Sequence, residues 1–425
     1  MSLSPLETSA LARDNYQGKA LKEHVLYLQT HSSYYKQALK WGGPLNDDFK
    51  ELLKQLPFTE KDDLARDNES FLCVDSGDLR DIVTTSGTLG DPVAVYLTEK
   101  DLKRLAKNEA DSYRIAGCSE KDRFQLLTTI DKRFMAGLAY FLGVREIGGC
   151  IIRSGPGALR LQWESIKLFK PTVLIAVPSF IPQLIAYANQ NGIDIRTTSV
   201  KKIICIGEPI RDADLKPNYL AQRITNDWDV QLFSTYASTE MGTAFTECEH
   251  GNGAHVQPEL MILEVLNEDG VQVLNGEKGE VVVTPLEIEG SPILRFRTGD
   301  VCHYYDEPCA CGRNTPRLGP VVGRKQQLIK FKGTSLYPNA IIDELNAMKE
   351  VVNFVIELES NEMGLDEVIL RVALRGENAE KKVKDRLADK LRVKPRVILS
   401  DKEAINKIKF NDNDRKPKIL IDNRQ

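Results

Sequence analysis

Residues 234–240 combine hydroxyl groups, an aromatic ring and a carboxylate in one short stretch. They read Ser-Thr-Tyr-Ala-Ser-Thr-Glu and follow a strand-like run at 230–233. In an open α/β sheet, ligands bind beyond the carboxyl ends of the strands. There, hydroxyls can donate hydrogen bonds to phosphate oxygens, and a carboxylate can hold Mg²⁺ among phosphates. The ordinary alternative is a helix start, with Ser238 or Thr239 as the N-cap and Glu240 in the first turn.

A second stretch, residues 84–92, places a loop rich in Ser, Thr and Gly between two β-prone runs. Glycines let a backbone approach a ligand closely, and backbone N–H groups together with hydroxyls can cradle phosphates. An ordinary hairpin turn uses the same residue types. The loop has no Gly-Lys-Ser/Thr sequence, so it is not a Walker-type phosphate loop.

A third stretch, Arg-Phe-Arg-Thr-Gly-Asp at 295–300, puts Asp300 just past another β-prone run. A carboxylate in that place can accept two hydrogen bonds from the diol of a ribose. A turn aspartate after glycine is the common alternative.

The elements that would position these residues alternate between strand and helix. Strands are expected at 124–130, 150–152, 172–177 and 202–206, with helices at 134–144, 158–168 and 181–191 between them. This order predicts an α/β fold with a largely parallel sheet and helices on both faces. Before it, residues 10–70 are expected to be helical, with Thr59 as an N-cap.

Beyond Glu240 the sequence predicts a β subdomain, and residues after 323 have a pattern of their own. Two helices and three strands expected at 339–399, followed by a basic stretch with an apolar 419–421, indicate a compact α+β unit. We therefore expect two domains, a large one at 1–322 and a small one at 323–425.

The composition excludes several classes of protein. The chain has 425 residues, 42% of them apolar and 28% charged, with a net charge of −4. These values are typical of a globular protein, and they argue against a nucleic-acid partner. We find neither an apolar run long enough for a bilayer nor a signal-peptide pattern, which favours a cytoplasmic protein without membrane partners.

Cysteine and histidine crowd into one region. Four of the 8 cysteines (248, 302, 309 and 311) and three of the 5 histidines (250, 255 and 303) lie there. Cys309 and Cys311, from one tight turn, with Cys248 and His255 would make a tetrahedral, structural zinc site. His250 could replace His255, while Cys302 and His303 are weaker candidates. The alternative is four unrelated residues with buried thiols.

These stretches, in this order, resemble the adenylate-forming (acyl-CoA synthetase-like) superfamily, and most closely the phenylacetate–CoA ligases. The resemblance covers nearly the whole chain. Its motifs in this sequence are the signature at 56–64, the phosphate loop at 84–92, the segments 176–179 and 207–209, the Tyr-Gly-Ser-Thr-Glu-like 236–240, the Tyr-Arg-Thr-Gly-Asp-like 295–300, the interdomain segment 323–338 and the lysine segment 415–422.

The resemblance implies a role for each matching position. Glu240 would bind Mg²⁺, and Lys416 would bridge the attacking carboxylate and the α-phosphate. The residues that would contact ATP are Thr84, Ser86, Gly87, Thr88 and Thr239 at the phosphates, Gly207, Glu208 and Pro209 at adenine with Tyr236 stacking nearby, Asp300 with Arg324 at the ribose, and also Ala237 and Ser238.

The implied reaction has two steps. A carboxylic acid attacks ATP, with Mg²⁺ and lysine neutralising the charge at phosphorus, and the thiol of coenzyme A then attacks the acyl-adenylate. The small domain would swing between the steps, and a homodimer is also implied. The helix at 134–141 and the corner at Tyr236 and Ala237 would line the acyl pocket, which leaves the acid open among phenylacetate, benzoate, indole acetate and short aliphatic acids.

Two positions depart from the pattern of this family. Asp91 stands where relatives have lysine, and Gln326 replaces an acidic hinge residue. Two alternatives therefore remain beside the CoA ligase: an adenylate-forming enzyme with another acceptor, and a degenerate nucleotide-binding regulator.

Overall fold

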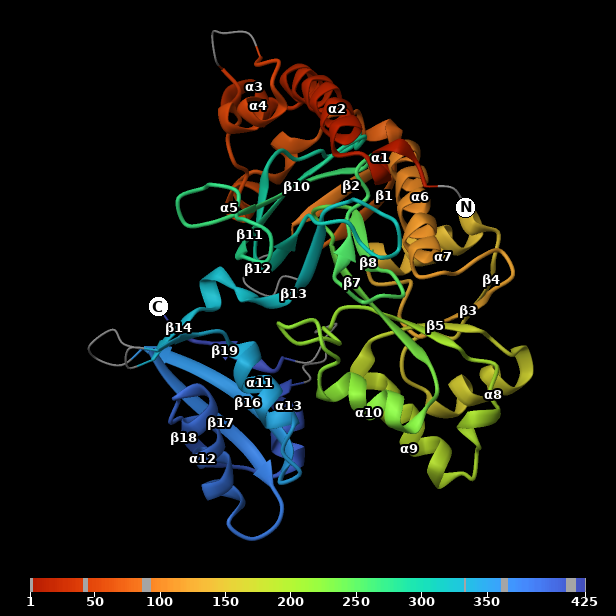
Figure 1. The fold of residues 1–425 in the computed structure, drawn as a ribbon, viewed down its shortest axis with the longest axis vertical. Helices are drawn as coiled ribbons and strands as arrows, with labels where there is room; N and C mark the ends of the chain where they lie inside the picture. The colour runs from red at the N-terminus through yellow and green to blue at the C-terminus, as the bar shows by residue number, and fades with distance from the viewer. Residues whose placement is uncertain are drawn as a thin grey trace. The chain divides into compact units, whose positions relative to one another are not determined.

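The computed structural model describes residues 3–40, 45–85, 93–331, 334–360, 366–409 and 418–424. The chain divides into two compact units. The first comprises Met1–Thr298 and Cys302–Pro320, and the second comprises Gly299–Val301 and Val321–Gln425. Figure 1 shows the elements of both units, and each is described by itself below.

The first unit contains a large sheet whose strands are parallel in one part and antiparallel in the other. Its α-helices are α1 (Pro5–Thr8), α2 (Ala10–His31), α3 (Ser33–Ala38), α4 (Phe49–Gln55), α5 (Lys61–Arg66), α6 (Glu99–Ile115), α7 (Met135–Ile147), α8 (Leu159–Phe169), α9 (Ile181–Gln190) and α10 (Tyr219–Asp227). Its strands are β1 (Leu79–Thr84), β2 (Ala94–Thr98), β3 (Arg123–Leu126), β4 (Cys150–Arg153), β5 (Val173–Ala176), β6 (Lys202–Cys205), β7 (Gln231–Ser238), β8 (Thr243–Glu247), β9 (Ala254–His255), β10 (Met261–Leu266), β11 (Lys278–Pro285), β12 (Phe296–Tyr305) and β13 (Arg317–Arg324), the last two of which extend into the second unit.

Eleven of the strands in the described part of the chain form one sheet, in the order β10-β11-β12-β13-β9-β8-β7-β6-β5-β3-β4. The pairs from β4 to β7 are parallel, and β7 pairs with β8 antiparallel. β1 and β2 form a separate antiparallel pair. The predicted α/β fold with a parallel sheet is therefore confirmed, and its β extension begins at β8.

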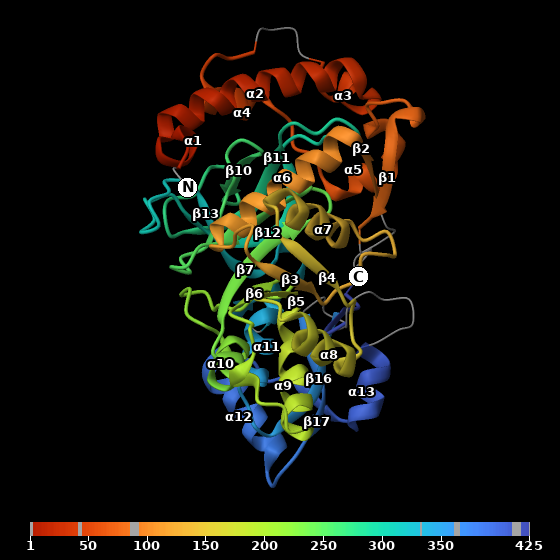
Figure 2. The ribbon, with the colours of Figure 1, turned by 90° about the vertical axis from the view of Figure 1, so that its right-hand side faces the viewer.

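Helices cover both faces of the parallel strands, as Figures 1 and 2 show, with α6 and α7 on one face and α8, α9 and α10 on the other. Side chains that alternate along each strand face the two layers. Leu174 and Ile203 pack with α8, α9 and α10, whereas Ile175 and Ile204 pack with α6 and α7. A strand buried on both faces needs a continuous apolar run, which is how these strands read in the sequence.

The structure rules out one alternative reading and one local prediction. Residues after Ser238 do not start a helix, because the chain turns at 239–242 and returns as β8. Thr59 is not the cap of α5. Its hydroxyl donates to the carbonyl of Leu294 at 2.7 Å, and the capping box of α5 is formed by Glu60 and Asp63.

The second unit has a small sheet with helices. Its elements are β14 (Ile329–Phe331), β15 (Thr334–Leu336), α11 (Pro338–Asn346), β16 (Val351–Ser360), β17 (Asp366–Leu374), α12 (Ala379–Leu391), β18 (Arg396–Leu399), α13 (Lys402–Lys409) and β19 (Leu420–Asp422). The sheet order is β18-β17-β16-β19. β19 pairs in parallel with β16, so the apolar residues in the basic stretch do form a strand, as predicted.

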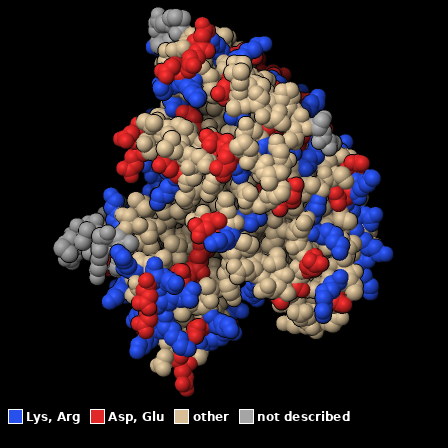
Figure 3. All heavy atoms as spheres, viewed as in Figure 1, with Lys and Arg blue, Asp and Glu red and all other residues tan. Residues whose placement is uncertain are grey.

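The surface agrees with the composition. Figure 3 shows basic and acidic side chains interspersed over the visible face of both units. Among the described residues, we find no helix with the length and apolar character needed to cross a bilayer.

Candidate active site and metal centre

The ends of strands β5 and β6 are tied together by Glu208. Its carboxylate accepts hydrogen bonds from the backbone N–H of Ser179 and from the Ser179 hydroxyl, each at 2.9 Å. Gly207 has a φ of +74°, a left-handed conformation that favours glycine. The carbonyl of Pro209 accepts from the side chain of Asn218 at 2.9 Å. The predicted residues 207–209 thus lie at the carboxyl edge of the sheet.

The end of β7 carries Tyr236, Ala237 and Ser238 at the same edge. Tyr236 lies opposite Phe245 in the antiparallel β7–β8 pair, and their ring centroids are 6.0 Å apart. The Ser238 hydroxyl accepts a hydrogen bond from the backbone N–H of Met241 at 3.3 Å, inside the turn that holds Thr239 and Glu240. The structure therefore presents the motif at 236–240 on a strand end and a tight turn.

Glu240 faces a lysine to which the sequence analysis assigned no role. The Nζ of Lys61 lies 3.7 Å from Oε1 of Glu240, and the side chains are 35% and 11% exposed. Lys61 is the first residue of α5. Its signal in the sequence was its place in the signature at 56–64, but only the fold brings it to Glu240, 179 positions further along the chain.

Buried contacts fix the start of α5 and therefore Lys61. The hydroxyl of Thr59 lies 2.6 Å from the hydroxyl of Tyr35, which in turn accepts from the backbone N–H of Leu294 at 2.9 Å. The backbone of Thr59 also bonds to Arg295 and Arg297 at the start of β12. Since these groups are buried and satisfied, the position of α5 against β12 is well specified.

The structure describes only part of the predicted phosphate loop at 84–92. Thr84 lies at the end of β1, is buried, and its backbone N–H donates to the carbonyl of Arg133 at 3.2 Å. Reciprocal hydrogen bonds between Thr85 and Val93 join the two sides of the loop. Ser86, Gly87 and Thr88 lie outside the described residues, as does the predicted catalytic Lys416.

The two predicted ribose contacts meet within the second unit. Nε of Arg324 donates to Oδ1 of Asp300 at 3.2 Å. The Asp300 side chain is 14% exposed and that of Arg324 is 41% exposed, so this ion pair is accessible to solvent on its arginine side.

Cys248, His255, Cys309 and Cys311 come together in the first unit, with their ligand atoms all within 4.8 Å of one another. The Sγ atoms of Cys248 and Cys309 are 3.7 Å apart, and Sγ of Cys311 is 3.6 Å from Nε2 of His255. A tetrahedral zinc ion with Zn–S bonds of about 2.3 Å would place its sulfur ligands about 3.8 Å apart. The donor set and its spacing therefore fit Zn²⁺.

The surroundings also suit a metal. The Nδ1 of His255 lies 2.9 Å from the hydroxyl of Thr315, which leaves Nε2 directed at the cysteines. Burial lowers the pKa of His255 to about 3, so the ring is neutral and can act as a ligand. Burial raises the pKa of Cys248 to about 12, so a cation would have to displace its proton.

Of the alternative ligands, His250 lies near Glu249, 3.7 Å from Nε2 to Oε1, and not in the four-residue cluster. His303 has its Nδ1 2.9 Å from the carbonyl of Gly276. Cys302 is buried in β12, also outside the cluster. The geometry selects His255 of the histidines considered.

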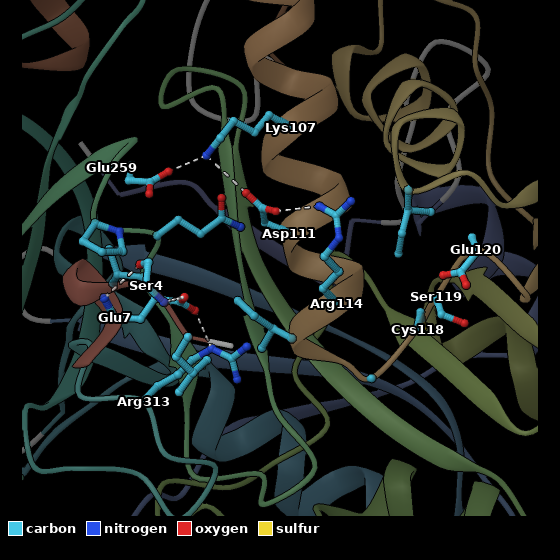
Figure 4. Close-up of a pocket in the computed structure, with 17 residues that line it drawn as sticks. Ser4, Glu7, Lys107, Asp111, Arg114, Cys118, Ser119, Glu120, Glu259 and Arg313 are labelled. Atoms are coloured by element: carbon cyan, nitrogen blue, oxygen red, sulfur yellow. Dashed lines mark hydrogen bonds and ion pairs between the residues drawn. The ribbon is translucent and has the colours of Figure 1, made fainter. Parts of the chain in front are cut away.

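A pocket of about 670 Å³ lies beside the cysteine–histidine cluster rather than at the strand ends. Figure 4 shows several pairs among the charged side chains that line it. Lys107 contacts Glu259 at 2.6 Å and Asp111 at 3.3 Å, and Arg313 contacts Glu7 at 2.9 Å. Of the predicted nucleotide-binding residues that the structure describes, none lines this pocket.

Three comparisons place the chain among known proteins. The model of the AMP-binding enzyme family matches residues 22–285. Phenylacetate–coenzyme A ligase of Thermus thermophilus is 28% identical over 84% of this chain and 80% of its own length, and that of Escherichia coli is 27% identical over 88% and 85%.

Solved structures agree on the fold. The crystal structure of a 2-hydroxyisobutyryl-CoA ligase in the postadenylation state superposes with a TM-score of 0.84 at 23% identity, covering 99% of this chain and 91% of that one. The ATP-bound MatB of Rhodopseudomonas palustris has a TM-score of 0.60 at 19% identity, over 78% and 66%. With the family model matching more than half of its length, the chain belongs to the AMP-binding, adenylate-forming enzyme superfamily.

Proposed function

We propose that this enzyme is an ATP-dependent carboxylate–CoA ligase of the phenylacetate–CoA ligase type. It joins a small carboxylic acid to AMP with release of pyrophosphate and then transfers the acyl group to coenzyme A. The similarity to phenylacetate–CoA ligases over most of the chain supports the reaction. An aryl acid is the proposed substrate class.

The observation that carries this proposal is the pairing of Lys61 with Glu240 at the end of β7. The carboxylate of Glu240 lies on a turn that also holds Thr239, and the ammonium group of Lys61 approaches it from α5. A cation ligand and a phosphate ligand therefore lie side by side. Mg²⁺ bound by Glu240 would neutralise charge on the polyphosphate. Lys61, freed from Glu240 as the metal binds, would pair with a phosphate oxygen.

The remaining roles follow the resemblance. Thr84 and the loop residues Ser86, Gly87 and Thr88 hold the phosphates, and Lys416 bridges the attacking carboxylate and the α-phosphate. Residues 207–209 and 236–238 border adenine. The carboxylate of Asp300 accepts hydrogen bonds from the ribose hydroxyls, and Arg324 orients this carboxylate through their ion pair. Both half-reactions use this nucleotide site.

We also propose that Cys248, His255, Cys309 and Cys311 hold a structural Zn²⁺. Four protein ligands leave no coordination position for substrate or water, which is typical of a structural rather than a catalytic zinc. The ion would tie the segment after β8 to the turn at 309–312 that precedes β13.

The test is pyrophosphate release from Mg-ATP in the presence of phenylacetate, with and without coenzyme A. Release that depends on the acid and is stimulated by coenzyme A is expected. ATP binding without release in the presence of any acid would contradict the proposal and favour a nucleotide-binding regulator.

A further inference from the structure

The inner face of α6 carries buried polar side chains that contact the chain directly after Glu240. Arg104, Asn108 and Ser112 recur every four residues, so they lie on one face of the helix. All three are buried, which costs free energy unless each group is hydrogen-bonded. Their partners therefore indicate what this face does.

Arg104 holds the end of the turn that contains Thr239 and Glu240. Its Nη1 donates to the carbonyl of Gly242 at 2.6 Å, and its Nη2 donates to the hydroxyl of Thr243 at 3.0 Å. The other two hydrogen bonds of the guanidinium go to the backbone carbonyls of residues 260 and 286, each at 2.6 Å. A planar, fixed fork of donors suits such a junction better than the ammonium of a lysine would.

Gly242 and Thr243 are in turn hydrogen-bonded to the two neighbours of Glu240, Thr239 and Met241. The hydroxyl of Thr243 donates to the carbonyl of Met241 at 3.1 Å, and the backbone N–H of Gly242 donates to the carbonyl of Thr239 at 3.3 Å. Gly242 has a φ of +54°. Arg104 is thus linked to both neighbours of Glu240, to Met241 through the hydroxyl of Thr243 and to Thr239 through the backbone of Gly242.

Asn108 fixes the first part of β8 in the same way. Its Oδ1 accepts from the backbone N–H of Ala244 at 2.7 Å, and its Nδ2 donates to the carbonyl of Ala244 at 3.2 Å. Gln257 accepts from Nδ2 of Asn108 at 2.8 Å and donates to the Ser112 hydroxyl at 3.0 Å. This second amide locks the orientation of the first.

We propose that Arg104 and Asn108 are positioning residues, which hold the turn at 239–242 so that Thr239 and Glu240 meet the polyphosphate and its Mg²⁺. The inference rests on the proposed function and deepens it. Neither residue touches substrate. Both act on adenylation, the step that uses the polyphosphate, and not on the transfer of the acyl group to coenzyme A, which starts after pyrophosphate has left.

The test measures the two half-reactions separately in Asn108→Ala, Arg104→Met and Arg104→Lys. Adenylation is followed as acid-dependent pyrophosphate release, and transfer is followed from supplied acyl-adenylate and coenzyme A. We expect the kcat of adenylation to fall about 10-fold or more, since small misplacements of reacting groups cost up to about 100-fold. The rate of transfer should stay within about 2-fold of wild type, so that the ratio of the two rates changes.

Arg317→Met is the matched control. Arg317 is also buried in the first unit and donates to two backbone carbonyls, those of Asn252 and Glu307 at 2.6 and 2.8 Å, away from the turn. The Arg317→Met variant should lower the Tm as Arg104→Met does, without changing the ratio of the adenylation rate to the transfer rate. If Arg104→Met fails to fold, Asn108→Ala decides alone.

Three outcomes would overturn the inference. If the positioning variants slow both half-reactions equally, or neither, the face of α6 is structural only. If Glu240→Gln loses adenylation while the positioning variants keep the wild-type ratio, the role of Glu240 stands and this inference fails. If Glu240→Gln adenylates at the wild-type rate, the proposed function of the turn and this inference fail together.

Discussion

Lys61 adds a cation to the proposed nucleotide site through its contact with Glu240. The side chain of Glu240 is 11% exposed and has a cation 3.7 Å away. A carboxylate so placed can exchange its ammonium partner for a metal ion that arrives with the phosphates. A lysine so placed can also bind the phosphates that arrive with the metal.

We expect Lys61→Ala to lower kcat/KM for Mg-ATP in adenylation by about 10-fold or more, because a charge-assisted hydrogen bond to phosphate is lost. Arg66→Ala on the same helix is the control, since Arg66 is 73% exposed and pairs only with Asp63, 3.6 Å away, among the ion pairs found for the described residues. Steady-state pyrophosphate release at varied Mg-ATP measures both. Equal kinetics for the two variants would remove Lys61 from the site.

A second residue, Glu109, makes stability depend on pH. It is buried where α6 meets α7, and a Cβ added to Gly143 would lie 2.3 Å from the Cβ of Glu109. Burial raises the pKa of Glu109 to about 8 from an ordinary value of 4.5. The folded protein therefore keeps a proton that the unfolded chain releases, so stability falls as pH rises from about 4.5 and levels off above about 8.

Glu109→Gln should remove this dependence. The Tm of the variant relative to wild type should increase between about pH 5 and pH 8, by the equivalent of roughly 1–4 kcal/mol. Glu99→Gln, at the exposed start of the same helix, should show no such trend. Thermal unfolding of the three proteins at several pH values decides the matter, and parallel curves for Glu109→Gln and wild type would contradict it.

At the scale of elements, the order of strands and helices could be predicted because its causes are local. Apolar runs bounded by turn residues predicted β5 and β6, and the structure confirms both with helices on each side. The clustering of Cys309 and Cys311 with Cys248 was likewise foreseeable from spacing.

Contacts between distant parts of the chain could not be predicted in this way. Arg104 meets Gly242 across 138 positions, and Lys61 meets Glu240 across 179. The N-cap prediction for Thr59 was wrong for the same reason, because its hydroxyl donates a hydrogen bond to the carbonyl of Leu294, 235 positions away. Which partner a polar side chain finds depends on the packed fold rather than on neighbouring residues.

The proposed zinc ligands Cys248, His255, Cys309 and Cys311 come from separate segments of the first unit, so loss of one should affect both metal binding and stability. Cys309→Ser should lower the zinc content from about one ion per chain to near zero and lower the Tm by roughly 5–10 °C, since a structural metal contributes directly to folding. Cys118→Ser, at another buried cysteine outside the cluster, should keep the zinc. Metal analysis and thermal unfolding provide both values. Wild-type protein without zinc, together with a Cys309→Ser variant that has the Tm of wild type, would contradict the proposal.

At the scale of the whole molecule, the chain divides into two compact units, and the predicted catalytic residues fall in both. The second unit comprises Gly299–Val301 and Val321–Gln425, and the domain boundary at 322/323 stays a prediction. A lid that carries Lys416 and turns after adenylation remains a prediction from the resemblance. It requires that Lys416 act in only one of the two half-reactions.

Lys416→Ala should therefore abolish acyl-adenylate formation and leave the transfer from supplied acyl-adenylate to coenzyme A within about 3-fold of wild type, because the lysine's charge is needed only while the phosphorus is attacked. Lys418→Ala serves as the neighbouring control. An unchanged circular dichroism spectrum would show that the fold is retained. Full adenylation by Lys416→Ala would rule out this assignment.

The central claim is that this enzyme forms an acyl-adenylate and passes the acyl group to coenzyme A. Mass spectrometry of the products made from Mg-ATP and a panel of acids (phenylacetate, benzoate, indole acetate and short aliphatic acids) tests it most directly. We expect an aryl-adenylate when coenzyme A is absent and the corresponding aryl-CoA thioester when it is present. An adenylate that persists unchanged when coenzyme A is added, or no adenylate from any acid, would contradict it.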